Sequence, residues 1–405
     1  MAFQTSGNIL VALKVETTIG VAVATVTGAT RLRITDSPGL TKSRAIVQSE
    51  ENRADGLKTM GRLGFKGVDG SYSAELTPGG ATDILLEGIT RGTWTTLTSV
   101  TFATMTSVTI GTNEVVANAG DWVGAQGIRV GDIFRLSNHG EAANNDLNTR
   151  VTAVTSLTIS TPDTTFTADA SAATTGTLSV LRKLITGTTP TRRSYQVEQY
   201  DVDTDLSEVF LGNRVTGFSL SASPGDMVQV TYTMQGLNND PKVTGTSPYY
   251  TSPSLTTTLG LIADDASIRF NGADITKLTG FNLDFSIDAN GEPTIGSLVS
   301  PDIFDNDMTV SGSVTGLRED FSNLTLFDAE TIFEISIVMQ GSTGEEDPPT
   351  CLAIYIPQVK IAALSAPVGG GDGAKIETLD LMIGPKTAST GNDGTVVAFH
   401  SSEAP

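Results

Sequence analysis

The chain has 405 residues, too many for one ordinary hydrophobic core, so two or three domains are expected. Its 25 basic residues stand against 45 acidic ones, and the net charge of −20 excludes binding to phosphate backbones through clustered lysine and arginine. Glycine is abundant, aromatic residues make up only 6%, and threonine, serine and valine are frequent, which predicts many short strands separated by turns.

A single cysteine, Cys351, excludes an internal disulfide and a multi-cysteine zinc site. We expect it to be a small buried residue of a strand. The first residues lack a basic region followed by a long apolar core, and no run approaches the ~18 apolar residues of a membrane span. The sequence therefore predicts a soluble protein that folds where it is made.

The first part of the chain alternates apolar stretches with one long polar segment. Residues 9–24 form an extended apolar arm, and residues 31–35 are expected to form a strand. The polar segment 36–56 is predicted to be a loop, and loops of this length inside compact domains are commonly functional or mobile. After a strand that ends near Pro78, residues 81–89 have the apolar spacing of a short helix, capped near Thr82 or Asp83.

Residues 214–236 predict a β-hairpin. Apolar and polar side chains alternate along residues 214–223 and again along 227–235, which gives each arm one apolar and one polar face. Pro224, Gly225 and Asp226 supply the turn between the arms.

A second hairpin, at residues 358–384, repeats this pattern. The proposed correspondences are Leu220-Ser221-Ala222 with Leu364-Ser365-Ala366, Gly225-Asp226 with Gly371-Asp372, and Met234-Gln235-Gly236 with Met382-Ile383-Gly384. Before it come a strand at 277–288 whose period Gly280 disturbs, a long loop at 289–307, a strand, a short helix within 317–328, and further strands. We interpret the common order as an internal duplication of a domain; chance resemblance between two Ser- and Gly-rich hairpins is the alternative.

About a hundred residues of the first half have no counterpart in the second. They are rich in threonine, and their short strands lie between closely spaced turn signals. This pattern predicts a small β-barrel or sandwich inserted in a surface loop. The expected organisation is a first domain formed by residues 1–96 with 185–245, an inserted β-domain at 97–184, a second domain at 246–390, and a C-terminal tail at 391–405.

Arrangements of residues that could carry out catalysis are not found. His139 and His400 have no sequence relation to a serine or cysteine that would support nucleophilic catalysis. The acidic segment 201–208 begins like a calcium loop but has Leu206 where glycine is required. The glycines of 369–374 precede a strand instead of a helix, unlike a dinucleotide-binding loop. We expect neither an enzyme nor a bound metal or cofactor.

Several segments, taken in order, resemble the major tail tube proteins of long-tailed bacteriophages. They are VALKVETTIGVA, IVQSEENRADG, GVDGSYSAELTPGGATDILLEGITRGTW, TRRSYQVEQY and RVTGFSLSASPGDMVQVTYTMQG. The resemblance spans the first half apart from its insertion and, more weakly, the second half. It implies a β-sandwich with a short helix that contributes a sheet to a ring, and stacked rings that form a conduit for DNA.

The resemblance also implies roles for particular residues and partners. The strands facing the lumen would carry Ser219, Ser221, Gln229, Thr231, Thr233 and Asp284. The loop reaching the neighbouring ring would carry Ser43, Arg44, Gln48, Glu50, Glu51 and Arg53. Expected partners are further copies of the chain, other phage tail proteins and DNA passing without specific binding. The expected location is the virion tail after assembly in the host cytoplasm, with no membrane contact.

Two tube domains per chain would make a ring of three chains with pseudo-sixfold symmetry, and a ring of six is the alternative. Two other classes of protein remain open at this stage. One is a structural or adhesive β-protein whose inserted domain binds carbohydrate, which the missing export signal and disulfides disfavour. The other is a hydrolase on a β-scaffold, which lacks a nucleophile and a base.

Overall fold

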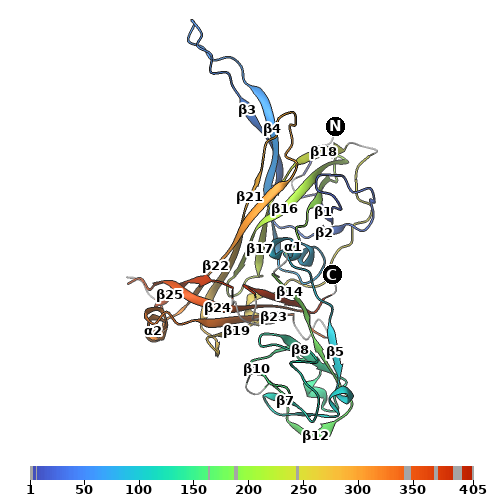
Figure 1. The fold of residues 1–405 in the computed structure, drawn as a ribbon, viewed down its shortest axis with the longest axis vertical. Coiled ribbons are helices and arrows are strands. Elements are labelled where there is room, and N and C mark those ends of the chain that lie inside the picture. The colour runs from blue at the N-terminus through green and yellow to red at the C-terminus, as the bar shows by residue number, and fades with distance from the viewer. Residues whose placement is uncertain are drawn as a thin grey trace.

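The structure is a computed structural model that describes residues 3–5, 7–162, 165–186, 190–242, 246–341, 348–368, 373–385 and 395–403. The protein is mainly β, as the composition predicted. Figure 1 shows an elongated molecule in which long strands run through the middle, the hairpin β3–β4 projects at one end, and the strands from β5 to β13 form a separate unit at the other.

A continuous antiparallel sheet of eight long strands forms the central layer. In spatial order these strands are β3 (Gly39–Val47), β4 (Arg62–Glu75), β17 (Gln229–Gly236), β16 (Leu206–Ala222), β21 (Leu278–Gly291), β22 (Ile303–Leu317), β25 (Ile376–Ile383) and β24 (Cys351–Ser365). Where the central strands cover the core, their side chains alternate between a buried face and a polar face, which is the period of two seen in the sequence. Two stretches depart from it, because β3 is mostly exposed and residues 351–357 of β24 are all buried. Cys351 is buried in β24, as expected.

Shorter elements cover the buried face of this central sheet. On the first half they are β1 (Ile9–Val15), β2 (Thr30–Leu32), β15 (Tyr195–Asp201), β18 (Asn238–Lys242) and α1 (Gly80–Thr90). On the second half they are β19 (Ala266–Phe270), β20 (Ala273–Ile275), β23 (Phe333–Gln340), β26 (Ala398–Ser401), β14 (Arg182–Ile185), α2 (Ser322–Asp328) and the short 3-10 turn η3 (Ala263–Asp265). One hydrophobic core runs through both halves.

Helix α1 shows why a short helix forms at this point of the chain. Leu85, Leu86 and Ile89 are buried, so the apolar stripe seen in the sequence faces the core. The helix begins at Gly80, before the expected caps Thr82 and Asp83, and the Asp83 carboxylate accepts the Gly79 N–H at 3.3 Å from inside the first turn.

Two sets of six elements have the same order and the same neighbours. The set β3, β4, α1, β15, β16 and β17 is matched by β21, β22, α2, β23, β24 and β25. Register shifts also recur, because β3–β4 has one between Arg44 and Ile46 and β21–β22 has one between Ile287 and Ala289. This repetition of pairing and irregularity is a structural signature of duplication.

The register shifts correct the residue match between the two hairpins. The pairing of β15 with β16 shifts register next to the pair Tyr195–Asn213, and the pairing of β23 with β24 shifts next to the pair Phe333–Val359. Asn213 and Val359 therefore occupy corresponding positions. Counting from them, Phe218 matches Leu364, whereas the sequence comparison matched Leu220 with Leu364. A period-two pattern fits equally well when it slides by two residues, which is why sequence alone gave the wrong offset. The proposed turn counterpart, Gly371-Asp372, lies outside the described residues.

The inserted residues form a small β-domain with its own core. One sheet contains β5 (Thr98–Thr101), β13 (Thr177–Val180), β8 (Ile133–Ser137) and β9 (Thr149–Arg150). The other contains β10 (Ala153–Val154), β11 (Thr158–Ser160), β7 (Glu114–Ala117), β6 (Val108–Ile110) and β12 (Asp169–Ala173), with 3-10 turns η1 (Phe102–Met105) and η2 (Ala142–Asn144). Trp122 is fully buried in a core formed by residues 100–180.

Three expectations about irregular segments differ from the structure. The whole segment 36–56 was expected to be a loop, but residues 39–47 form β3, paired with β4. Parts of the expected loop 289–307 likewise belong to β21 and β22. Residues 398–401 of the expected tail form β26, which pairs with both β24 and β14. In each case the pairing partner is distant in sequence or the apolar alternation is weak, so local pattern was uninformative.

Candidate assembly surface

The six residues expected to line a lumen lie together on the polar face of the central sheet. Ser219 pairs with Thr231 on one side and with Asp284 on the other. Ser221 pairs with Gln229, and Thr233 lies two residues beyond Thr231. Since paired residues and residues two apart project to the same side, all six share one face. Gln229, Thr233 and Asp284 are exposed, and the others are partly exposed.

This polar face continues across the whole sheet with small hydroxylated side chains. Ser73 pairs with Thr231, and its hydroxyl lies 3.1 Å from that of Thr231. On the second half, the hydroxyls of Thr315 and Thr378 lie 3.2 Å apart. Asp69, Asp284 and Asp380 are exposed on the same face, each in a different row of the ladder. The face is therefore hydroxyl-rich and carries acidic groups at intervals.

The opposite face of the same strands is the aromatic centre of the core. Phe218 packs against Tyr232, Phe285 and Phe399 with ring centroids 5.5, 5.7 and 6.2 Å apart. These residues come from both halves of the chain and from β26. The contrast between the two faces fixes the orientation of the sheet, because reversing it would expose these rings and bury hydroxyls.

Strands β16 and β21 join the two halves within one chain. Six consecutive residue pairs, from Gly217–Ser286 to Ala222–Phe281, continue the sheet across this junction. Above it, Asp305 of β22 is bound by three arginines of the first half: Arg192 Nε at 2.7 Å, Arg214 Nη1 at 3.0 Å and Arg91 Nη1 at 3.1 Å. The Asp305 side chain is only 7% exposed, so the junction is held by a nearly buried carboxylate as well as by backbone hydrogen bonds.

Both outer edges of the central sheet are open among the described residues. Strand β3 pairs with β4 alone, and residues 361–365 of β24 pair with β25 alone. Strand β3 corresponds to β21 in the other half, and β24 corresponds to β16. Strands β21 and β16 pair with each other within the chain. An unpaired strand edge is a template for adding another strand.

The hairpin β3–β4 extends beyond the body as a projection, which we call the finger and define as residues 42–66 (Figure 1). Of the residues expected in an inter-ring loop, Ser43 and Arg44 lie in β3, and Gln48, Glu50, Glu51 and Arg53 lie in the tip. The Arg44 guanidinium donates to the carbonyl groups of Leu63 and Gly64 at 3.2 Å each, which ties the two strands together. The finger is thus a paired hairpin over residues 42–47 and 62–66 and a loop over residues 48–61.

The inserted domain contacts the second half through ionisable side chains that the sequence did not indicate, Asp132 with His400 and Arg150 with Asp274. Lys183 Nζ lies 2.7 Å from the Asp132 carboxylate, and His400 Nε2 lies 3.4 Å from the same group. Burial alone would raise the pKa of Asp132, but the contacts with His400 and Lys183 hold that pKa below its usual value. Arg150 also pairs with Asp274 of the second half. No motif marks these residues, because they are brought together only by the fold.

A sheet with one core face, one hydroxyl-rich face and two edges left open among the described residues is the architecture of a structural β-protein. The chain belongs to the phage tail tube protein family, whose model matches residues 7–399. That family consists of structural proteins of the virion tail that assemble with one another and with other tail proteins. None of the curated proteins compared with this chain matches it. Within the described residues, no helix has the length and apolar character needed to cross a membrane.

Proposed function

We propose that three copies of this chain close into a ring and that stacked rings form the tube through which phage DNA leaves the capsid. Each chain contributes the eight strands of its central sheet. The single observation that carries the proposal is the internal β16–β21 junction, because it is a complete example of how one tube domain joins the next.

The junction between chains follows from the internal one. The matching register shifts place Ser365 of β24 where Ser219 lies in β16, and Thr41 of β3 where Asp284 lies in β21. Because Ser219 pairs with Asp284 inside the chain, Ser365 of one chain is expected to pair with Thr41 of the next. Head-to-tail contacts of this kind close into a ring when the rotation permits, and closure removes both open edges.

In this ring the polar face of the sheet lines the lumen. Duplex DNA carries one negative charge per ~1.7 Å of its axis, and a basic surface would hold it by releasing counterions. Hydroxyls interspersed with Asp69, Asp284 and Asp380 offer hydrogen bonds to water and repel phosphates. Such a lumen lets DNA slide without specific binding. The inserted domain lies outside the barrel wall, and assembly takes place in the host cytoplasm.

The test measures the number of chains in a ring and the position of the contact between neighbouring chains. Native mass spectrometry of isolated rings should give three chains, and six full-length chains would overturn the trimeric model. Oxidising rings of a Thr41→Cys, Ser365→Cys variant should produce covalent trimers and nothing larger on denaturing gels. A control with Thr41→Cys and Thr155→Cys, the latter on the inserted domain, should remain uncrosslinked. Rings that form without any Thr41–Ser365 crosslink would contradict the proposed register.

A further inference from the structure

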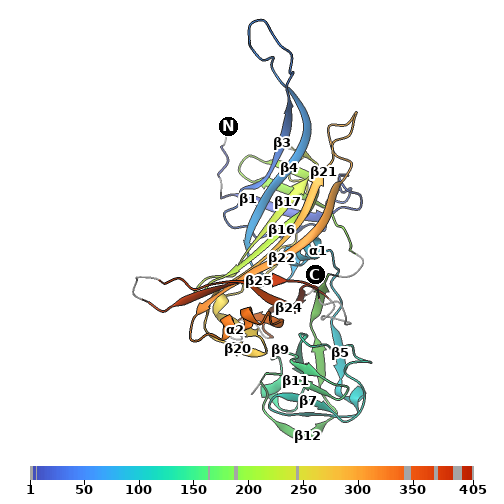
Figure 2. The same cartoon turned by 60° about the vertical axis from the view of Figure 1, so that its left-hand side comes forward.

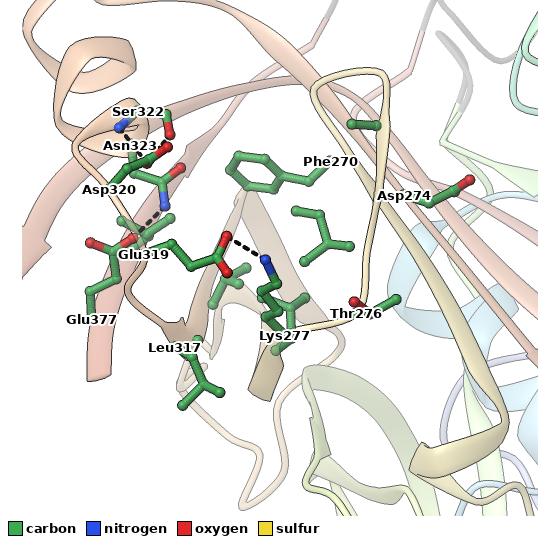
Figure 3. A pocket seen from close by; sticks show the side chains of 16 residues that line it. Phe270, Asp274, Thr276, Lys277, Leu317, Glu319, Asp320, Ser322, Asn323 and Glu377 are labelled. Carbon is green, nitrogen blue, oxygen red and sulfur yellow. Dashed lines mark hydrogen bonds and ion pairs between the residues drawn. The ribbon is translucent and has the colours of Figure 1, made fainter. Parts of the chain in front are cut away.

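Each half of the chain has a hollow at the same place, and only the hollow of the second half is large. In the first half it lies between β2, the end of β4 and α1, and the linker that leads into the second half, residues 246–265, reduces it to about 10 Å³. In the second half it lies between β20, the end of β22 and α2 and measures about 400 Å³ (Figure 3). Their lining residues correspond, for example Leu32 to Ile275 and Ala81 to Asn323. The second hollow therefore has the place for a segment like the linker.

The linker binds the first half through the backbone, just before it begins β19. The Leu261 N–H donates to the Leu76 carbonyl, and the Val228 N–H donates to the Leu261 carbonyl, at 2.9 Å each. The Leu261 side chain is only 1% exposed. The linker thus adds one residue to the sheet beyond the ends of β4 and β17.

The second half has the same backbone groups at the corresponding place. The strand pairings match Arg318 to Leu76 and Lys375 to Val228. The Arg318 N–H donates to the Lys375 carbonyl at 2.8 Å, as the Leu76 N–H does to the Val228 carbonyl. The Arg318 carbonyl and the Lys375 N–H have no partner among the residues that the structure describes. This acceptor and this donor can bind one residue of an added segment.

The residues that correspond to the linker are those before β1. Strands β1 and β19 hold equivalent places, because they pair with β15 and β23, whose register shifts match. Leu13 of β1 corresponds to Phe270 of β19, and counting back from them matches Gln4 to Leu261. Figure 2 shows the N-terminus near β1, far from α2 and β20, and Figure 1 shows the same separation. The N-terminal residues that fit the hollow therefore belong to another copy of the chain.

Side chains in the two halves differ in a complementary way at this place. Gly260 of the linker has no room for a side chain, because a Cβ there would lie 2.3 Å from Met227 Cε. The counterpart of Gly260 is Phe3, and the counterpart of Met227 is Ala374. The large side chain has thus changed sides, and the short Ala374 leaves the room that a phenylalanine needs.

The other neighbour of this position suits an aromatic ring. A Cβ on Gly260 would lie 3.7 Å from the Glu75 Cβ, and the counterpart of Glu75 is Leu317, which is apolar, 41% exposed and part of the lining of the hollow. Phe3 is 91% exposed. Contact between Phe3 and Leu317 would remove apolar surface of both residues from water. The Thr5 N–H donates to Asp203 of its own chain at 2.9 Å, which anchors the segment beside its own body.

We propose that the N-terminal residues of one copy bind the second half of the neighbouring copy in the same ring, at the hollow between β20 and α2. Gln4 exchanges backbone hydrogen bonds with Arg318 and Lys375 of the neighbour, and the Phe3 ring packs on Leu317. The segment holds the place between chains that the linker holds within a chain. This inference rests on the ring proposed above, and it adds a second contact to the pairing of β24 with β3.

A disulfide tests the position of the segment. The 3.7 Å between the Cβ positions at the equivalent place of the linker suits a disulfide, and the native Cys351 is buried. Oxidised rings of a Phe3→Cys, Leu317→Cys variant should therefore give covalent trimers on denaturing gels. A Phe3→Cys, Leu157→Cys variant is the matched control, because Leu157 is 39% exposed on the inserted domain, and it should remain uncrosslinked. Rings without the Phe3–Leu317 link, or equal linking to Leu157, would overturn the proposal.

Exchanging the complementary side chains tests the packing. Ala374→Met fills the room that Phe3 needs and should raise the subunit concentration at which rings form by about fivefold or more. Adding Phe3→Gly recreates the pair of Gly260 and Met227 and should lower that concentration again. Sedimentation velocity measures the fraction of chains in rings. Unchanged assembly of Ala374→Met, or no rescue by Phe3→Gly, would contradict the packing.

Failure of the ring itself gives a different result. Without trimeric rings, the Thr41–Ser365 and Phe3–Leu317 crosslinks would both be absent. Trimeric rings that form the Thr41–Ser365 crosslink but not the Phe3–Leu317 crosslink would refute the N-terminal contact alone.

Discussion

Replacing Asp305 by asparagine should weaken the junction between the two halves of the chain. Its carboxylate is the shared counter-charge of Arg91, Arg192 and Arg214, and the side chains of Arg91 and Arg214 are only 11% and 12% exposed. Breaking a buried ion pair by removing one partner costs roughly 3–5 kcal/mol, because the remaining charge stays buried and unpaired. Arg192 is 53% exposed and Arg214 keeps Asp302 at 2.9 Å, which places the expected loss near the lower end, about 3 kcal/mol.

Urea denaturation of unassembled subunits measures this loss without screening the charges. Asp302→Asn should cost less, about 1 kcal/mol or below, because Asp302 is 35% exposed and binds only one of the three arginines. Asp307→Asn is the matched control, since Asp307 is exposed and has no ion pair among the described residues. A loss below 1 kcal/mol for Asp305→Asn, or one equal to that of Asp307→Asn, would refute the role of Asp305 as the hub of the junction.

Four further outcomes are expected. Phe218→Ala should cost roughly 3–5 kcal/mol in urea denaturation, because it removes the ring at the centre of the aromatic core; a Ser219→Ala control on the polar face should change stability by less than about 1 kcal/mol. Burial raises the pKa of Asp83 from 3.8 to about 6 despite the Arg182 contact at 2.9 Å, so between pH 4 and 6 this carboxyl holds more of a proton in the folded chain than in the unfolded one; its contribution to the free energy of unfolding should fall as the pH rises through this window, and Asp83→Asn should remove that contribution from the measured slope. Replacing the insertion, about residues 98–183, by a short Gly-Ser linker should leave tubes intact, because Thr98 pairs with Val180 and the ends are adjacent; monomers or aggregates alone would make the insertion an assembly element. Backbone amides at 48–61 should exchange rapidly in subunits and slowly in tubes, whereas those of β3 bonded to β4 should already be slow in subunits; equal rates at the tip in both states would argue against ordering on contact.

The sequence determined the features that depend on local pattern. Alternation along residues 214–236 gave the hairpin and both of its faces, because side-chain direction in a strand follows directly from residue parity. The same parity placed Ser219, Thr231 and Asp284 each on the polar face of its own strand, and only the strand pairing brings these three faces together. The apolar spacing of 81–89 gave helix α1, and recurring motifs indicated the duplication, which needs only order along the chain.

Tertiary structure alone decided which distant residues meet. Nothing in the residues around Asp305 indicates that three arginines, 91 to 214 positions earlier in the chain, converge on it. Strand β3 was not anticipated because its polar sequence is stabilised as a strand by pairing with β4 and not by an apolar face. The residue-by-residue match between the two hairpins could also be decided only from the fold. A pattern that repeats every two residues fits equally well when one hairpin is moved by two residues against the other. The register shifts beside Asn213 and Val359 remove that ambiguity.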